Sequence, residues 1–330
     1  MNPTRGQAIE IRLASQRATS FTVSILDRDG FRVRTSVPVV RLEGATSVHR
    51  WDGRDDTGSV VPDEAYSLHI RTTNSNGEPV YFPASEAERS LSVAAAVYDR
   101  VRGVLSYSLP WPGRVHVQTG SARIDERTKQ PVGPVLKTLV NREPRPSGSV
   151  VEHWNGYDES GTVHVPSLPD FRVAVYATSL PENAIICVGN DRRKFLDVVR
   201  QRQDRSLLPT KTPTAHSHHL GLTAMQDVAP KLVIRPLNAV QEKAGGRWRV
   251  RSSSLRFELL LEGPSAQAFA QQPGKIVVFR GSRLIREQPA SLPPVEMEVR
   301  LPARSGAQDL LTVNWASDWG PAAVNSLPLR

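Results

Sequence analysis

In this 330-residue chain, the segment RWDGRDDTGSVVP at residues 50–62 contains a cluster of three acidic side chains. Asp52, Asp55 and Asp56 lie within residues 52–56. Carboxylates this close together are typical of calcium sites and of general acid–base catalysis. Their spacing is not that of an EF-hand calcium loop. The residue types alone leave a metal site, a pair of catalytic carboxylates and a structural turn open.

A second copy of the segment, HWNGYDESGTVHVP at residues 153–166, favours the turn. Asn155 stands where the first copy has Asp52, and an amide keeps the oxygen of the turn but loses the charge that a metal or a proton transfer needs. Glycine suits positions of positive φ, and Asp or Asn side chains accept hydrogen bonds from nearby backbone N–H groups. The expected turn residues are Trp51, Asp52, Gly53, Asp55 and Gly58 in the first copy, and Trp154, Asn155, Gly156, Asp158 and Gly161 in the second.

The residues around both turns alternate between apolar and polar, as in half-buried strands. FTVSI at residues 21–25 and YSLHI at residues 66–70 show this pattern in the first copy. Pro and Gly, 26 and 22 in number, interrupt the apolar runs as turns between short strands would. An internal duplication of short strands predicts two antiparallel β-sandwiches in tandem. The second copy carries an insertion at residues 120–133, in its central hairpin.

The first turn, followed by Val61-Pro62 and Tyr66, resembles the signature of FlgD-type immunoglobulin-like modules, the family named for the flagellar hook-capping protein. The second turn is similar to the same family, although VPSLPDF replaces its Pro-Asp-Glu-Ala-Tyr step. The resemblance covers roughly residues 1–190. It implies a β-sandwich used for assembly or adhesion, with no catalytic residues. It does not imply a flagellar role.

Strand-like segments return after residue 231, among them LRFELLLEG and a hairpin, VVFRGSRLI, with Gly281-Ser282 in its turn. The segment SGAQDLLTVNWASDWGPAAVNSL resembles the last two strands of many bacterial Ig-like domains. We therefore expect an all-β chain of three antiparallel Ig-like β-sandwich domains in series, joined by a short connector that contains a helix. Placed end to end, three such domains would form a rod of roughly 100 Å. The expected boundaries are 1–92, 93–190, 191–230 for the connector, and 231–330.

The connector holds the one convincing helical stretch, NDRRKFLDVVRQRQDRSLL at residues 190–208. Asn190 or Asp191 is expected to cap this helix. Its apolar stripe, surrounded by arginines, predicts either packing on a neighbouring sandwich or docking on a protein partner or an anionic membrane. The partner-contact candidates in the chain are Arg192, Arg193, Phe195, Arg200, Arg202, Arg205, Trp315 and Trp319. For the two tryptophans, packing in the core or in a turn is the favoured interpretation, and a partner contact is the alternative.

His216, His218 and His219 form a cluster in the Pro- and Thr-rich part of the connector. Three imidazoles can ligate zinc or copper, but no Cys or carboxylate flanks them closely. Solvated or partner-contacting histidines are the favoured interpretation. Metal or haem ligation and pH-dependent binding stay open. No metal or other cofactor is expected.

Composition narrows the function class. The single cysteine, Cys187, lies in an apolar run and is expected to be a small buried hydrophobe. The formal net charge of +9 is spread along the chain, which does not favour a dedicated nucleic-acid surface. No nucleophile elbow, phosphate-binding glycine loop, zinc-protease motif or CxxC pair occurs in the sequence. The protein is therefore expected not to be an enzyme.

The favoured function is a structural subunit, extrinsic to a membrane, that braces or links a larger bacterial protein complex. Its expected partners are other protein subunits and, through the basic helix, anionic lipid head groups. The alternative is a surface adhesin or carbohydrate-binding module that uses Trp111, Trp315 and Trp319 as aromatic platforms. A nucleic-acid binder that uses the arginines of residues 192–205 is the third choice. The resemblance points to the periplasm or cell surface, yet no signal peptide is visible and a cytoplasmic location stays open.

Overall fold

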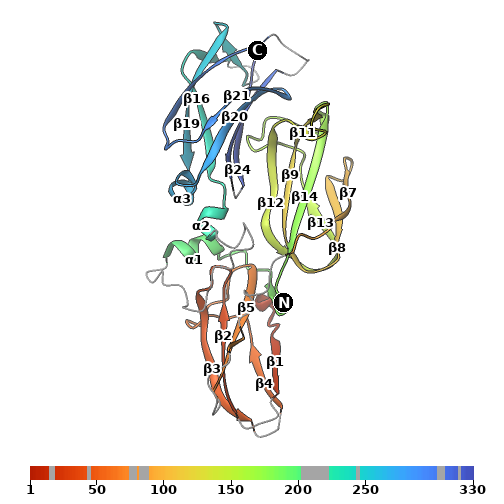
Figure 1. The fold of residues 1–330 in the computed structure, drawn as a ribbon, viewed down its shortest axis with the longest axis vertical. Coiled ribbons are helices and arrows are strands. Elements are labelled where there is room, and N and C mark those ends of the chain that lie inside the picture. Colours follow the sequence, from red (N-terminus) through yellow and green to blue (C-terminus); the bar gives the residue numbers. More distant parts are fainter. Residues whose placement is uncertain are drawn as a thin grey trace.

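The computed structural model describes residues 1–14, 19–42, 46–73, 80–81, 89–201, 223–242, 246–302, 309–318 and 321–330. Its strands pair antiparallel and form three β-sandwiches, so the predicted all-β fold is confirmed. Figure 1 shows the first sandwich at the bottom, the second at the right and the third at the upper left. No helix in the described ranges is long and apolar enough to cross a membrane.

The first sandwich packs a two-stranded sheet, β1-β4, against a sheet in the order β15-β5-β2-β3, with β6 beside β5. Its core contains Ile25, Trp51 and Tyr66, each at most 2% exposed. One of its strands, β15, comes from after the second sandwich and pairs with β5. The strands are β1 (Ile9–Ala14), β2 (Thr19–Leu26), β3 (Arg32–Leu42), β4 (Thr46–Trp51), β5 (Glu64–Thr73), β6 (Val80–Tyr81) and β15 (Ile185–Cys187).

The second sandwich has two three-stranded sheets, β12-β9-β14 and β13-β8-β7. Apolar residues of β8 and β9, including Leu105, Val115 and Val117, are 0% exposed between the sheets. The predicted insertion forms the small hairpin β10-β11. The strands are β7 (Ala94–Asp99), β8 (Val104–Leu109), β9 (Gly113–Ser121), β10 (Arg123–Ile124), β11 (Pro131–Val132), β12 (Val135–Arg145), β13 (Gly148–His153) and β14 (Phe171–Ser179).

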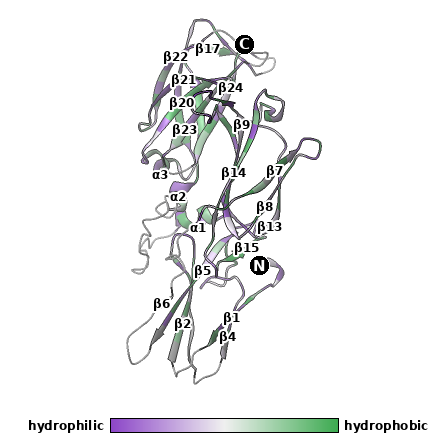
Figure 2. Cartoon of the chain, turned by 45° about the vertical axis from the view of Figure 1, so that its right-hand side comes forward, coloured by the Kyte–Doolittle hydropathy of each residue, from purple (hydrophilic) through white to green (hydrophobic). Residues whose placement is uncertain are grey.

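The third sandwich packs β16-β19-β22 on β21-β20-β23-β24 and has the predicted hairpin at Gly281-Ser282. Buried positions alternate along β16, β19 and β22 and meet the buried runs of β20 and β23 in a core that contains Phe257 and Trp315. Figure 2 colours stretches of these strands green, for hydrophobic residues. Its elements are β16 (Lys231–Pro236), β17 (Ala239–Gln241), β18 (Trp248–Val250), β19 (Ser254–Glu262), α3 (Ala266–Ala270), β20 (Gly274–Arg280), β21 (Arg283–Pro289), β22 (Val295–Arg300), β23 (Leu310–Ser317) and β24 (Ala322–Pro328).

The connector contributes two short helices, α1 (Phe195–Gln201) and α2 (Ala224–Asp227). In the described ranges, 3₁₀ turns occur at Pro3–Arg5 and Val165–Ser167. The third sandwich lies beside the second, with β24 against β12, so the expected straight rod is wrong (Figure 1). The chain leaves the second sandwich, returns to the first and then places the third against the second. The predicted domain boundaries stay predictions.

Candidate functional site

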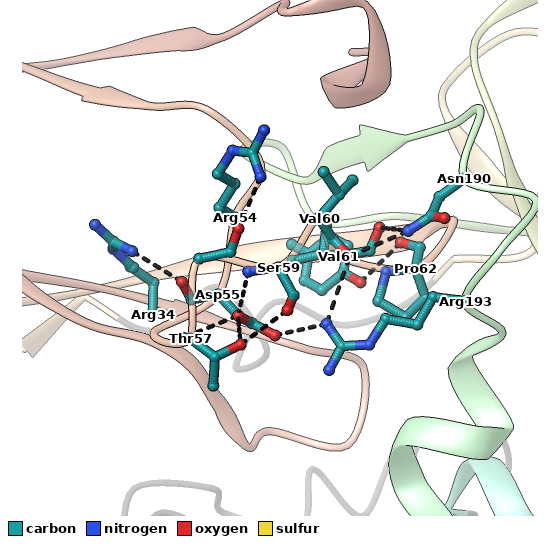
Figure 3. A network of polar contacts seen from close by, with 12 residues as sticks. Arg34, Arg54, Asp55, Thr57, Ser59, Val60, Val61, Pro62, Asn190 and Arg193 are labelled. Carbon is teal, nitrogen blue, oxygen red and sulfur yellow. Dashed lines mark hydrogen bonds and ion pairs between the residues drawn. The ribbon is translucent and has the colours of Figure 1, made fainter.

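The first tryptophan turn is a closed hydrogen-bonded unit at the edge of the first sandwich (Figure 3). The Trp51 indole N–H donates to the Arg54 carbonyl at 2.9 Å. The indole ring packs edge-on against Tyr66, with 5.6 Å between the ring centroids. Oδ1 of Asp55 accepts hydrogen bonds from the backbone N–H groups of Thr57 and Ser59, each at 3.0 Å. This oxygen of Asp55 is thus occupied by the turn itself.

The second turn repeats this geometry. The Trp154 indole N–H donates to the Tyr157 carbonyl at 2.8 Å, and Asp158 accepts from two backbone N–H groups at 3.0 Å. Asn155 Oδ1 accepts the Tyr157 N–H at 3.1 Å, as Asp52 accepts the Arg54 N–H at 3.2 Å. The amide oxygen of Asn155 therefore accepts the same hydrogen bond as the carboxylate of Asp52, which supports the turn interpretation for Asp52.

Four glycines of the two turns have a left-handed backbone, as their positions predicted: Gly53, Gly58, Gly156 and Gly161, at φ of 73°, 80°, 84° and 73°. A Cβ on Gly53 would lie 2.3 Å from the Pro3 ring, so this position also needs glycine for close approach. Among the described residues, no three His, Cys, Asp or Glu side chains gather in a way that could hold a metal ion.

Asp55 has a further role that Asp158 does not share. Its Oδ2 accepts a hydrogen bond from Arg193 at 2.6 Å, so the connector binds the first turn (Figure 3). Asn190 adds two bonds, from its side-chain amide to the Val60 and Val61 carbonyls at 3.1 and 2.9 Å. Burial alone would raise the pKa of Asp55, but hydrogen bonds from Thr57, Arg193 and Ser59 outweigh it and lower that pKa.

The predicted helix start is therefore corrected. Helix α1 begins at Phe195, because Asn190 bonds back to the first sandwich rather than capping a helix. Asp63 holds the same segment by accepting the backbone N–H groups of Gly189 and Asn190, each at 2.8 Å. Arg193, expected as a contact to another protein, instead makes an internal ion pair.

Five charged residues from the two N-terminal sandwiches and the connector meet in what we call the buried junction: Arg28, Glu64, Arg114, Arg142 and Asp227. The Asp227 carboxylate is 0% exposed and lies 2.6 Å from Arg28 and 2.9 Å from Arg142. Glu64, 6% exposed, lies 2.6 Å from Arg114 and 3.8 Å from Arg28. Burial alone would lower the pKa of Arg28, but the charges of Glu64 and Asp227 raise it, so Arg28 stays charged. The Arg28–Asp227 and Arg114–Glu64 pairs are also hydrogen-bonded, and buried charges are tolerated where they are paired in this way.

The backbone at Arg142 is shaped for this junction. Arg142 is not a glycine, yet its φ is 50°, and a β-bulge shifts the register of β12 between Asn141 and Glu143. Bulges bend a strand and redirect a side chain. Here the bulge accompanies an arginine whose side chain is 13% exposed and reaches Asp227. Asn141 adds a bond from its amide to the Asp227 carbonyl at 2.8 Å.

The second and third sandwiches share a separate interface. Leu310 of β23 is 5% exposed and packs in one cluster with Leu136 and Trp154 of the second sandwich. The Asn314 side chain pairs with the backbone of Val135 through two hydrogen bonds, at 2.9 and 2.8 Å. Because β12 is an edge strand, the amide acts as a short substitute for a neighbouring strand.

The remaining predicted site residues separate into three groups. Trp315 is 2% exposed in the third core, so the favoured interpretation of core packing is correct and the alternative of a partner contact is wrong. Arg192 and Arg200 are exposed, and Phe195 is half-buried. The candidates Arg202, Arg205, His216, His218, His219 and Trp319 lie outside the described residues.

Cys187 is 1% exposed, and burial raises the pKa of its thiol to about 12, as expected for a core cysteine. Trp111, a predicted aromatic platform, is 45% exposed. Sequence reasoning missed the buried junction. The one signal that the sequence offered was Arg28 between two aspartates in the LDRDG segment.

Comparison with known proteins supports the first sandwich. Residues 3–76 match the family model of the FlgD Ig-like domain. No curated protein matches the chain. One similar solved structure is from a 1.5-MDa bacterial ice-binding adhesin. The match has 9% sequence identity, covers 98% of this chain and 90% of that chain, and has a TM-score of 0.20.

Two further structures have comparable values. The BSP domain of a biofilm associated protein shares 10% identity over 97% of this chain and 77% of that one, with a TM-score of 0.21. The FN1–FN3 domains of chicken CNTN1 share 12% identity over 98% and 95%, with a TM-score of 0.19. We carry no function over from likenesses this weak. The N-terminal part of the chain, residues 3–76, is thus similar to a FlgD Ig-like domain.

Proposed function

We propose that this protein is a non-catalytic assembly subunit, extrinsic to a membrane, that braces or links the parts of a larger bacterial protein complex. The observation that carries the proposal is the buried junction, in which Asp227 of the connector pairs with arginines of two sandwiches. A buried charge that loses its partner is costly, so the parts it joins resist separation. Parts held in this way suit a brace better than a flexible tether.

The second interface adds to this support. Leu310 fills an apolar site beside Trp154, and Asn314 bonds to both backbone groups of Val135. The three sandwiches are thereby held at two places, one charged and one apolar. We infer a unit that presents its outer surfaces at fixed distances to partner subunits. The second sandwich is inferred to be a further FlgD-type module, because its Trp154 and Asn155 form the same backbone hydrogen bonds as Trp51 and Asp52 of the first turn.

The inferred docking surface lies at α1. Arg200 of the helix and Arg192, which precedes it, are exposed, while Arg193 is anchored to Asp55. A short helix whose preceding segment is fixed to the first sandwich offers these two cations to an acidic protein surface or to anionic lipid head groups. We place the protein at the membrane in the periplasm or on the cell surface, on the strength of the FlgD-type domain alone.

The test is native purification from the membranes of the source cell, with the co-purifying chains identified by mass spectrometry. We expect a stoichiometric membrane complex. The double variant Arg192→Glu, Arg200→Glu should lose it, whereas Arg300→Glu, an exposed arginine of β22, should keep it. Anionic phospholipid vesicles then separate a lipid contact from a protein contact. Recovery of the wild-type chain alone, with no stoichiometric partner, refutes the proposal.

A further inference from the structure

The outer face of the β12-β9-β14 sheet has a hollow of about 480 Å³. Arg114, His116 and Gln118 of β9 line it, because they alternate with Val115 and Val117, which are 0% exposed in the core on the other face. Its volume falls in the range of ligand sites, roughly 300–1,000 Å³. The hollow lies on one sandwich and is separate from the surface proposed for partner docking.

An exposed aromatic ring stands over this face. Tyr176 of β14 is 61% exposed and lies opposite His116 in the strand register. Within the described ranges, neither the Tyr176 hydroxyl nor the Gln118 amide forms a hydrogen bond to another part of the chain. The hollow thus combines an open aromatic face with polar groups available to a ligand.

The positive charges at the hollow are already balanced. Arg114 pairs with Glu64 at 2.6 Å, and Arg142 pairs with Asp227 at 2.9 Å. A phosphate or carboxylate ligand would have to compete with these buried carboxylates for the same guanidinium groups. The balance favours a ligand that carries no charge and bonds through hydroxyl groups.

The strand edge beside the hollow is also occupied. The Leu91 N–H donates to the Ala177 carbonyl at 2.8 Å, and the Ser179 N–H donates to the Arg89 carbonyl at 2.8 Å. This end of β14 therefore already has a backbone partner. An extended peptide cannot add to it as a further strand, which is the usual way that a sheet edge captures a peptide.

We propose that this hollow binds a neutral carbohydrate chain. Tyr176 supplies a flat face for the apolar C–H side of a sugar ring, as aromatic side chains do for amphipathic ligands. Gln118 and Thr178 lie along the hollow to bond sugar hydroxyls. This binding activity is additional to the bracing role and does not depend on it.

The test uses the full chain on a printed array of neutral oligosaccharides, with acidic glycans, a single-stranded oligonucleotide and an acidic peptide as comparators. We expect binding to at least one neutral glycan. Tyr176→Ala should weaken it about tenfold, because the stacking face and its buried area are lost. Gln118→Ala should weaken it less.

Tyr157→Ala is the matched control, since Tyr157 is 41% exposed but lies on the second tryptophan turn, away from the hollow. It should bind as the wild type does, and circular dichroism checks that each variant is folded. Three results overturn the proposal: no neutral glycan is bound, only charged comparators are bound, or Tyr176→Ala binds as tightly as the wild type.

Discussion

The Arg28 guanidinium donates a 2.6 Å hydrogen bond to Asp227, 199 residues later in the chain. Arg28 lies in the turn between β2 and β3 of the first sandwich, and Asp227 ends α2 of the connector. The same carboxylate lies 2.9 Å from Arg142 of the second sandwich. One buried aspartate therefore joins three parts of the chain that are remote in sequence.

Replacement of that carboxylate by an amide of the same size should be costly. Asp227→Asn leaves the charges of Arg28 and Arg142 buried without their partner, and we expect the free energy of unfolding to fall by about 3–5 kcal/mol. Urea unfolding measures it. Asp197→Asn is the control, because its pair with Arg200 is 56% exposed on both sides and 3.9 Å long, so a change within about 0.5 kcal/mol is expected. Equal effects of the two changes would contradict the role of the junction.

The left-handed backbone at Arg142 leads to a second prediction. Arg142→Ala and Arg142→Gly both remove the ion pair to Asp227, but only glycine adopts φ of 50° without strain. We expect the glycine variant to be more stable than the alanine variant by about 1 kcal/mol. The comparison isolates backbone strain, because both variants lose the same charge. Equal midpoints in urea would mean that the bulge relaxes when the side chain is removed.

The lowered pKa of Asp55 predicts a pH dependence. Because the folded-state pKa lies below the usual 3.8, ionised Asp55 stabilises the fold at neutral pH, and this contribution is lost as the pH falls below about 4 through the lowered value. Asp55→Asn should be less stable than the wild type at pH 7, and the difference should shrink on acidification. Thermal unfolding of both proteins, measured at a series of pH values from 7 to about 2, follows this difference in stability.

Asp52→Asn is the matched control for this series, because Asn155 fills the equivalent place in the second turn with the same backbone hydrogen bond. Its stability at pH 7 should stay within about 0.5 kcal/mol of the wild type. A loss as large as that of Asp55→Asn would show that the charge of Asp52 matters after all.

The apolar interface between the second and third sandwiches is tested at Leu310. Leu310→Ala should leave a cavity beside Trp154 and cost about 2–5 kcal/mol, since the side chain is 5% exposed in that cluster. Limited proteolysis should then cut between the two sandwiches faster than in the wild type. Leu284→Ala, at a position 43% exposed on β21, is expected to change neither stability nor cleavage.

The turns were predictable because their chemistry is local. Gly53 needs a positive φ, and Asp55 bonds to backbone only two and four residues later, so residue types and spacing carry the information. The duplication gave the same pattern twice, and Asn155 in the second copy favoured a turn over a metal site from the sequence alone.

The junction was not predictable for the opposite reason. Arg28, Glu64 and Asp227 occupy ordinary polar positions in sequence and become neighbours only after the sandwiches have packed. The same holds for Arg193, which looked like a free basic residue and lies 2.6 Å from Asp55. Trp315 was placed in a strand by resemblance to Ig-like domains, and alternation gave no guide there because β23 is buried on both faces from Leu310 to Trp315.

The fixed arrangement of the three sandwiches is tested most directly by a distance measurement between two spin labels. Labels at Val48→Cys of β4 and Leu292→Cys of the third sandwich can be attached selectively, because these positions are 53% and 68% exposed and Cys187 is buried. Pulsed electron paramagnetic resonance should give one narrow distance distribution, which Asp227→Asn combined with Leu310→Ala should broaden. A broad distribution in the otherwise unchanged chain would contradict a rigid brace.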